Sequence, residues 1–311
     1  MMRIDIVTCL PELVFPLLEH SIIGRARERG LIEINVINLR DFTEDRHKTT
    51  DDLPYGGGGG MVMKIEPIHR CLNFLTQIGE TKKEGEASTQ RLDPQLNPQP
   101  DPQTNNSLEK LPGVRIAITD PRGKRFTQKI AREWATDKHL ILLCGHYEGV
   151  DDRVRQHLVT DEISIGDFIL TGGELPALVI ADALTRLQVG TLGDADAPDK
   201  DSFSENLLEY PHYTRPKEYN GWVVPQVLLN GNHLEIEKWR RWHQLRATQS
   251  RRPDLFGQIT LSKQDIKLLS SEEPTAPPDP REAKRILKEQ MREASKERDA
   301  KLPISGDVAS D

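Results

Sequence analysis

The sequence lacks the marks of several large protein classes. It has no apolar run of about 18 residues, the length a helix needs to cross a membrane, and its first residues do not form a signal peptide, so we expect no membrane contact. Its three cysteines, Cys9, Cys71 and Cys144, are odd in number and contain no C-x-x-C pair. This pattern argues against a disulfide framework or a structural zinc site and is typical of a reduced, cytoplasmic protein.

Two nucleotide-binding signatures and a basic excess are also missing. The chain contains no G-x-x-x-x-G-K-[ST] motif, and no G-x-G-x-x-G follows its first expected strand. The 42 Lys and Arg residues are outnumbered by 49 Asp and Glu residues, which gives a formal net charge of -7. Bulk charge therefore does not indicate nucleic-acid binding, and any such surface must be local.

Two segments are too polar to build a core. Residues 80–112 carry five prolines among Gln, Asn, Asp and Ser, and we expect a disordered insertion there. Residues 271–311 begin with a proline-rich stretch and continue as a dense run of charges. We expect this second segment to be disordered or a solvated tail.

The rest of residues 1–190 alternates β-branched runs with helical patterns. Strands are expected at 4–8, 32–39, 114–119 and 140–144, and in a run that ends at 165; helices are expected at 127–137 and 174–187. This alternation predicts an α/β domain with a parallel sheet. After a polar linker at 191–202, residues 203–270 are expected to form a small, mostly helical domain, whose main helix begins with a capping box at 232–235.

Glycine-bearing loops follow three of the expected strands, at 119–123, 145–149 and 165–174. Parallel sheets bind ligands at the carboxyl ends of their strands, and glycine lets a ligand approach the backbone closely. One such loop alone would more often be an ordinary turn between a strand and a helix. Three loops at the same edge of a sheet predict a shared pocket.

Two further segments have either an ordinary structural role or a role in binding, and the sequence alone does not decide between the two. The five glycines at 56–60, flanked by mixed charges, are either a flexible linker or a backbone surface that a polymer or phosphate can approach. Residues 238–252 contain six basic side chains and no acid, with Trp239 and Trp242 between them. This stretch is either the solvated face of a helix or a surface that contacts phosphates.

Taken together, the motifs resemble those of the bacterial tRNA (guanine-N1)-methyltransferases, the TrmD family of the knotted SPOUT class. The matching motifs occur in order over about residues 2–256, outside the insertion, at 40–43, 45–47, 54–58, 60–61, 145, 147–149, 164–167, 172–176, 201–203, 211–216 and 231–233. The resemblance implies a parallel sheet with a C-terminal trefoil knot and a small helical C-terminal domain. It also implies a homodimer and a requirement for Mg²⁺, to which we assign no ligands in the chain.

The activity implied by the resemblance is methyl transfer from S-adenosylmethionine to N1 of the guanosine at tRNA position 37, next to the anticodon. The implied catalytic residues are Asp201, as the general base, and Arg186, which stabilises charge on O6. From the sequence around it alone, Asp201 would more often be a helix cap before Phe203.

Binding residues follow from the same resemblance and from the loops described above. The cofactor is expected to contact Thr119, Asp120, Pro121, Gly145, Tyr147, Glu148, Gly149, Ile165, Gly166, Asp167, Phe168, Ile169, Leu170, Gly172, Gly173 and Pro176. The tRNA is expected to contact Arg46, His47, Asp51, Gly56, Gly57, Gly58, Gly60, Lys238, Arg240 and Arg241.

The chain also departs from the family pattern. His146 stands where many relatives carry arginine, so no contact is assigned to its side chain, and shorter members lack the insertion and the tail. Two rival functions are a SPOUT methyltransferase for another RNA position and a catalytically inert tRNA-binding module. The motifs at 201–203 and 211–216 argue against the first rival, and the presence of Asp201 and Arg186 argues against the second.

Overall fold

The computed structural model describes residues 1–81, 113–194, 196–275 and 288. They belong to two compact units, Met1–Lys200 and Asp201–Asp311, and the division falls inside the segment expected to be a linker. Most of the expected insertion at 80–112 and of the expected tail at 271–311 lies outside the described residues.

A five-stranded parallel sheet forms the centre of the first unit. Its strands lie in the order β2-β1-β6-β5-β7, and every neighbouring pair is parallel. The strands are β1 (Met2–Thr8), β2 (Ile32–Asn38), β5 (Val114–Arg125), β6 (His139–Cys144) and β7 (Asp161–Ser164). The predicted parallel α/β sheet is therefore confirmed, and each of its expected strands is present.

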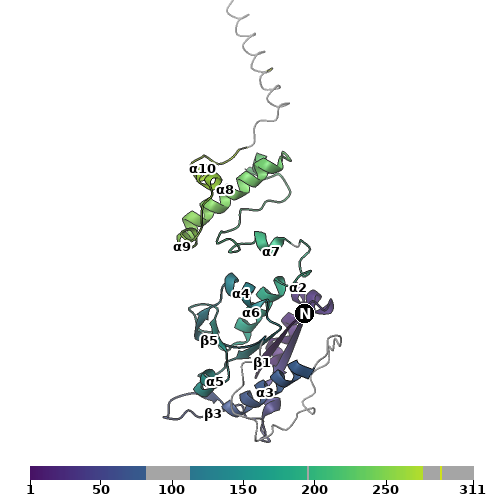
Figure 1. Ribbon diagram of the computed structural model, residues 1–311, viewed down its shortest axis with the longest axis vertical. Coiled ribbons are helices and arrows are strands. Elements are labelled where there is room, and N and C mark those ends of the chain that lie inside the picture. The colour runs from purple at the N-terminus through teal and green to yellow at the C-terminus, as the bar shows by residue number, and fades with distance from the viewer. Residues whose placement is uncertain (82–112, 195, 276–287, 289–311) are drawn as a thin grey trace, which may run out of the picture. The chain divides into compact units, whose positions relative to one another are not determined.

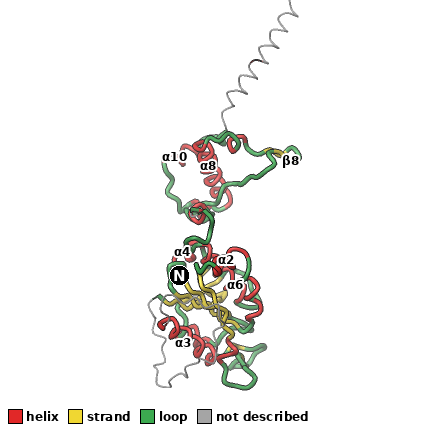
Figure 2. The backbone as a smooth tube through the Cα atoms, turned by 90° about the vertical axis from the view of Figure 1, so that its right-hand side faces the viewer, coloured by secondary structure: helices red, strands yellow, loops and turns green. Residues whose placement is uncertain are grey.

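Helices cover both faces of this sheet (Figures 1 and 2). One face carries α2 (Ser21–Glu28), α4 (Gln128–Trp134) and α6 (Glu174–Arg186), and the other carries α3 (Ile65–Thr81) and α5 (Asp152–His157). Along β6, Leu140 and Leu142 pack into the first core, whereas Ile141 and Leu143 pack into the second. Burial on both faces explains why this strand is almost entirely apolar.

Shorter elements connect the layers of the first unit. They are η1 (Pro11–Leu13), α1 (Phe15–Leu18), η2 (Leu39–Phe42), the antiparallel pair β3 (Asp51–Asp52) and β4 (Val62–Met63), and α7 (Ala197–Lys200).

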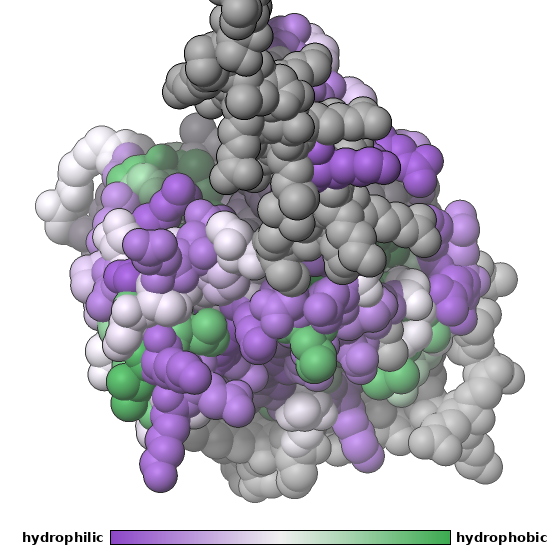
Figure 3. Space-filling view, turned by 90° about the horizontal axis from the view of Figure 1, so that it is seen from above, coloured by the Kyte–Doolittle hydropathy of each residue, from purple (hydrophilic) through white to green (hydrophobic). Residues whose placement is uncertain are grey.

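None of the helices among the described residues is both long and apolar enough to span a membrane. The face shown in Figure 3 is mostly hydrophilic, and its apolar groups form small separate patches.

Strand β5 differs from the prediction, which broke it at residues 120–123. The strand continues to Arg125, but Thr119 and Lys124 both pair with Ile163, so the four residues between them bulge out of the sheet. A Cβ atom on Gly123 would overlap the backbone of Ile163, which is why glycine occupies this position. The bulge holds Asp120 and Pro121 at the carboxyl edge of the sheet.

The second unit contains the antiparallel pair β8 (Glu218–Tyr219) and β9 (Trp222–Val223), η4 (Gln226–Leu228), α8 (His233–Arg251), α9 (Pro253–Phe256) and α10 (Lys263–Leu269). The Asn232 side chain caps α8, as predicted, by accepting from the N–H of Glu235 at 3.4 Å. The predicted capping box is only half formed, because the N–H of Asn232 donates to the Asn230 side chain at 2.9 Å. The Glu235 carboxylate accepts from Lys238 at 2.9 Å. A complete capping box, between Ser262 and Asp265, starts α10 instead.

Asp265 joins α10 to α8. Its nearly buried carboxylate accepts two hydrogen bonds from Arg241, at 2.8 and 3.2 Å, and one from the N–H of Ser262 at 3.0 Å. The Arg241 hydrogen bond, helped by those from Ser262, outweighs burial and lowers the pKa of Asp265 to about 2. This carboxylate is therefore ionised at neutral pH and holds two helices together.

Acid should weaken the second unit through Asp265. Its folded pKa of about 2 lies below the unfolded value of about 3.9, so its contribution is present above about pH 4 and is lost as the pH falls through 2. The contribution is about 2 kcal/mol of unfolding free energy. Asp265→Asn should destabilise the unit at pH 7 and flatten its pH dependence between pH 4 and pH 2.

Denaturant unfolding, followed by the fluorescence of buried Trp239, measures both effects. The matched control is Asp254→Asn, because Asp254 forms an exposed ion pair with Arg252 that should contribute little. Equal pH dependence in the wild type and Asp265→Asn would show that another group makes the unit acid-sensitive.

Candidate functional site

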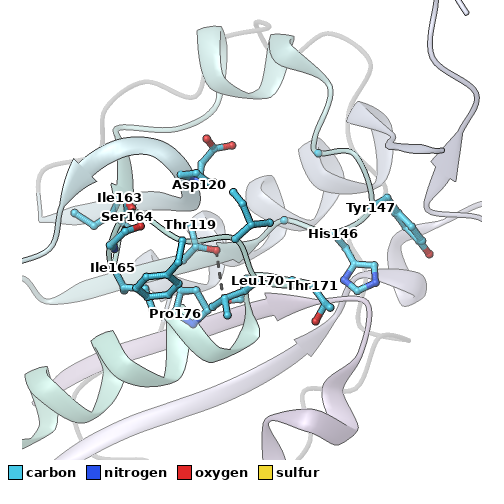
Figure 4. Close-up of a pocket in the computed structure, with 18 of the residues that line it drawn as sticks. Thr119, Asp120, His146, Tyr147, Ile163, Ser164, Ile165, Leu170, Thr171 and Pro176 are labelled. Atoms are coloured by element: carbon cyan, nitrogen blue, oxygen red, sulfur yellow. Dashed lines mark hydrogen bonds between the residues drawn. The ribbon is translucent and has the colours of Figure 1, made fainter. Parts of the chain in front are cut away.

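A cavity of about 310 Å³ opens where β5, β6 and β7 end (Figure 4). All three of the predicted glycine-bearing loops line it. The lining residues are Thr119, Asp120, Pro121, Gly145, His146, Tyr147, Glu148, Gly149, Ile163, Ser164, Ile165, Gly166, Phe168, Ile169, Leu170, Thr171, Gly172, Gly173 and Pro176.

The structure thus brings together every residue expected to contact the cofactor except Asp167. The carboxylate of Asp167 accepts from Arg125 at 2.5 Å instead. Four lining residues were not predicted: His146, Ile163, Ser164 and Thr171. Ile163 and Ser164 lie within β7 itself and not in the loop that follows it. They line the cavity because it extends down to this strand, and the loop sequences do not reveal its depth.

Backbone contacts join the three loops. The N–H of Gly173 donates to the carbonyl of Gly145 at 2.8 Å, and the Thr119 hydroxyl lies 3.4 Å from the carbonyl of Gly173 (Figure 4). A Cβ atom on Gly173 would overlap the Thr119 hydroxyl and lie 2.7 Å from Cα of Cys144. Glycine is required here because the third loop lies directly on the end of β6.

Apolar and polar side chains both line the cavity. Figure 4 shows Ile165 and Ser164 on one side and His146 and Tyr147 on the other. Tyr147 has a φ of 58°, in the left-handed region that bulky residues rarely adopt. Such backbone strain is common at ligand-binding sites. The arrangement suits a ligand with a flat apolar part and a charged or polar part.

Asp120 shapes one wall of this cavity. Its carboxylate pairs with Arg155 and accepts from the N–H of Arg122 at 2.9 Å, and the side chains of Asp120 and Arg155 are both nearly buried. Burial opposes ionisation, but these donors outweigh it and keep the pKa of Asp120 below its usual value. Asp120 therefore carries a negative charge that Arg155 holds in place.

The glycine run at 56–60 lies beside the second loop. The N–H of Glu148 donates to the carbonyl of Met61 at 3.0 Å, and a Cβ atom on Gly60 would overlap the Glu148 side chain. A Cβ on any residue from 56 to 59 would meet nothing within 4 Å. The run therefore has two parts: the first four glycines present open backbone, and Gly60 packs against a wall of the cavity.

The residues expected to bind tRNA lie in both units. Arg46 and His47 are exposed in the loop after η2, and Asp51 begins β3, which pairs with the strand that follows the glycine run. In the second unit, Lys238 pairs with Glu235 at 2.9 Å, and the guanidinium of Arg240 lies 4.8 Å from the centre of the Tyr210 ring.

Arg241 differs from these residues because it joins two carboxylates, those of Asp265 and Glu205. A guanidinium held in this way stabilises the unit whether or not RNA is bound. Arg241 is therefore the weakest candidate for a phosphate contact among the basic residues predicted on α8.

The two expected catalytic residues belong to different units. Arg186 is the last residue of α6, and Asp201 is the first residue of the second unit. Both side chains are half-buried. The structure therefore does not bring them together within one unit.

No group of three His, Cys, Asp or Glu side chains in residues 1–81, 113–194 and 196–275 is placed to hold a metal ion. No residue of the chain is therefore assigned to Mg²⁺.

A parallel α/β sheet with a glycine-lined cavity at the carboxyl ends of its strands is the arrangement of a ligand-binding α/β protein. Residues 2–96 and 95–258 match the family model described as tRNA (Guanine-1)-methyltransferase TrmD. The chain therefore belongs to the TrmD family, as its motifs suggested.

Individual relatives agree with this assignment. The chain is 48% identical over 269 residues to the tRNA (guanine-N(1)-)-methyltransferase of Brevibacillus brevis, which covers 86% of this chain and 97% of that protein. It is 45% identical over 268 residues to the protein of the same name from Desulforamulus reducens, covering 86% of this chain and 94% of that protein. The protein of that name from Dehalococcoides mccartyi is also 45% identical over 268 residues, or 86% of this chain and 96% of that protein.

Replacing Gly60 by alanine should impair the cavity. Gly60 has a φ of 83°, and its new Cβ would displace the Glu148 side chain. Gly59→Ala is the matched control, because Gly59 lacks a positive φ and has open space around it. We expect Gly60→Ala to lower the affinity for S-adenosylmethionine at least tenfold in calorimetry, and Gly59→Ala to leave it unchanged. Equal affinities would mean that Glu148 does not depend on this contact.

Proposed function

We propose that this chain transfers the methyl group of S-adenosylmethionine to N1 of the guanosine at tRNA position 37. The cavity is the observation that carries this proposal. All but one of the residues that the family motifs assign to the cofactor line this one space, although they come from three separate loops. Family membership supplies the reaction class, methyl transfer to guanine in tRNA.

The cavity residues fit S-adenosylmethionine. Ile165, Leu170 and Pro176 offer an apolar surface for the adenine ring. Gly172 and Gly173 let the third loop pack closely against Thr119, Cys144 and His146, where a side chain would clash. Glu148 also lines the cavity, and its carboxylate would favour the positive sulfonium. When bound, the cofactor supplies an electrophilic methyl group.

In this proposal Asp201 is the general base and Arg186 stabilises the negative charge that develops. Guanine N1 bears a proton and is a poor nucleophile, so the Asp201 carboxylate removes that proton as the N1–methyl bond forms. Negative charge grows on O6 during this step, and the Arg186 guanidinium stabilises it. The methyl group would come from the bound cofactor, whose sulfur would keep the electrons of the broken bond and leave as S-adenosylhomocysteine.

We also propose the family's trefoil knot, formed by the segment between β7 and α6. β7 is an edge strand, whereas α6 packs against β1 and β6 in the middle of the sheet. The chain must therefore cross the carboxyl ends of the intervening strands, and the bond from Gly173 to Gly145 lies on this path. Knots are so rare that sequence patterns alone would not suggest one.

A homodimer belongs to the same proposal. The outer face of α6 exposes Leu175 and Val179, which lie four residues apart on the same side of the helix. Leu13, Phe15 and Leu17, around η1 and α1, are also exposed. A second copy of the chain would cover such surfaces. Because α6 starts at the cavity wall, a partner on this face would lie beside the cofactor.

The proposed setting is the cytoplasm. Cys9, Cys71 and Cys144 are all buried and free, which agrees with a reducing compartment.

Mass mapping of modified nucleosides tests the proposed reaction. Transfer RNA is incubated with the protein and methyl-labelled S-adenosylmethionine, and the label is located in the nucleosides and in the sequence. We expect 1-methylguanosine at position 37. Label at another nucleotide would favour a different RNA methyltransferase, and cofactor binding without any label would favour an inert binding module.

Asp201 should act on a cofactor bound to the other subunit. We expect Asp201→Ala to keep cofactor affinity and lose methyl transfer by several orders of magnitude, whereas a lost helix cap would cost only about 1 kcal/mol of stability. A suitable partner variant is Gly166→Val, because Gly166 has a φ of 155° and a Cβ there would clash with the Phe168 ring.

Mixing Asp201→Ala with Gly166→Val shows whether the base and the cofactor pocket of one active site come from the same chain or from different chains. A mixed dimer contains one intact site if the base and the pocket come from different chains, so activity should return. If mixed dimers form and remain inactive, Asp201 and the pocket act within one chain.

A further inference from the structure

The hairpin of β8 and β9 carries an exposed aromatic pair that none of the motifs above includes. Tyr219 and Trp222 are directly opposite each other across the two strands, with ring centres 6.2 Å apart. Residues directly opposite in a hairpin point to the same face. Tyr219 is 61% exposed and Trp222 is 74% exposed, whereas Trp239 of the same unit is fully buried.

The hairpin is held in a defined shape. Its two-residue turn consists of Asn220 and Gly221, whose φ angles of 52° and 81° are those of the tight turn that suits a twisted hairpin. The N–H of Val224 donates to the carbonyl of Lys217 at 2.9 Å and closes its base. The two rings are therefore presented on a formed backbone, so little ordering is needed when a partner binds.

Two cations precede the hairpin in the sequence. Lys217, directly before β8, and Arg215, two residues earlier, are exposed and form no ion pair with any side chain that the structure describes. The nearest acid in sequence, Glu218, is paired with Val223 and therefore points to the opposite face of the hairpin. Two exposed rings and two exposed cations therefore lie close together in the sequence at this hairpin.

We propose that Tyr219 and Trp222 form a stacking platform for unpaired bases of the RNA substrate, with Arg215 and Lys217 contacting its phosphates. Proteins recognise single-stranded RNA by stacking splayed bases on aromatic rings and by placing cations along the backbone. The anticodon loop of a tRNA offers such unpaired bases next to the nucleotide methylated in the function proposed above, on which this inference rests.

An RNA hairpin with an anticodon-type loop serves as the probe, and a blunt duplex with the same stem serves as its comparison. Replacing both Tyr219 and Trp222 by alanine in the full chain should weaken hairpin binding at least tenfold. The affinity for the duplex and for S-adenosylmethionine should not change. The matched control replaces both residues by phenylalanine, which keeps a stacking surface and should bind the RNA hairpin about as well as the wild type.

Fluorescence provides a second test that does not depend on how well the alanine variant folds. Adding the RNA hairpin should quench wild-type emission, and most of this quenching should be absent in Trp222→Phe, because the exposed indole is the ring that meets the bases. Equal quenching in both proteins would overturn the proposal. Loss of subunit association without loss of RNA affinity in the alanine variant would also overturn it, since the rings would then contact protein.

The two proposals can fail separately. If the alanine variant loses RNA-hairpin binding but the wild type methylates a different nucleotide, the platform stands and the assigned position is wrong. If position 37 is methylated and the alanine variant binds RNA normally, the function stands and the platform is wrong.

Discussion

The first unit depends on one close backbone contact, in which the turn before α6 lies on the end of β6. The N–H of Gly173 donates to the carbonyl of Gly145 at 2.8 Å, and no side chain fits between the two segments. The next residue, Glu174, is buried and accepts from the Thr8 hydroxyl at 2.6 Å, so the same contact also seats α6 on β1. The same turn therefore closes the cavity, through Gly173, and positions α6 on the sheet, through Glu174. This explains why glycine and glutamate occur next to each other here.

Sequence patterns could predict the parallel sheet and the loops of the cavity, because both follow from local rules. Buried strands are apolar runs, and parallel strands end at the same edge. Side-chain directions were harder to predict. Asp167 lies in a predicted loop but pairs with Arg125, and Ser164 lines the cavity from within a strand. Hydrogen-bond partners were also hard to predict: the N–H of Asn232, which a capping box needs, donates to the Asn230 side chain, and Glu235 binds Lys238.

Charge is used differently in the two units. In the first, the pairing of Asp120 with Arg155 is nearly buried and fixes a wall of the cavity. In the second, the basic stretch on α8 is partly occupied by the unit itself, since Arg241 binds two carboxylates. A count of basic residues therefore overstates what is available to RNA. The RNA surface proposed here rests instead on exposed glycine backbone, exposed aromatic rings and a few cations without an ion pair among the described side chains, in a chain whose net charge is -7.

The central claim is that three loops, held together by glycine contacts, form the binding site for S-adenosylmethionine. Calorimetric titration of the cofactor into the wild type and into Gly166→Val tests this most directly, with thermal melting as the check on folding. A Cβ at Gly166 would strike the Phe168 ring in the cavity wall. The account predicts one cofactor per chain for the wild type and at least a hundredfold weaker binding, about 2.7 kcal/mol, for the variant. Unchanged affinity in a folded variant would contradict it.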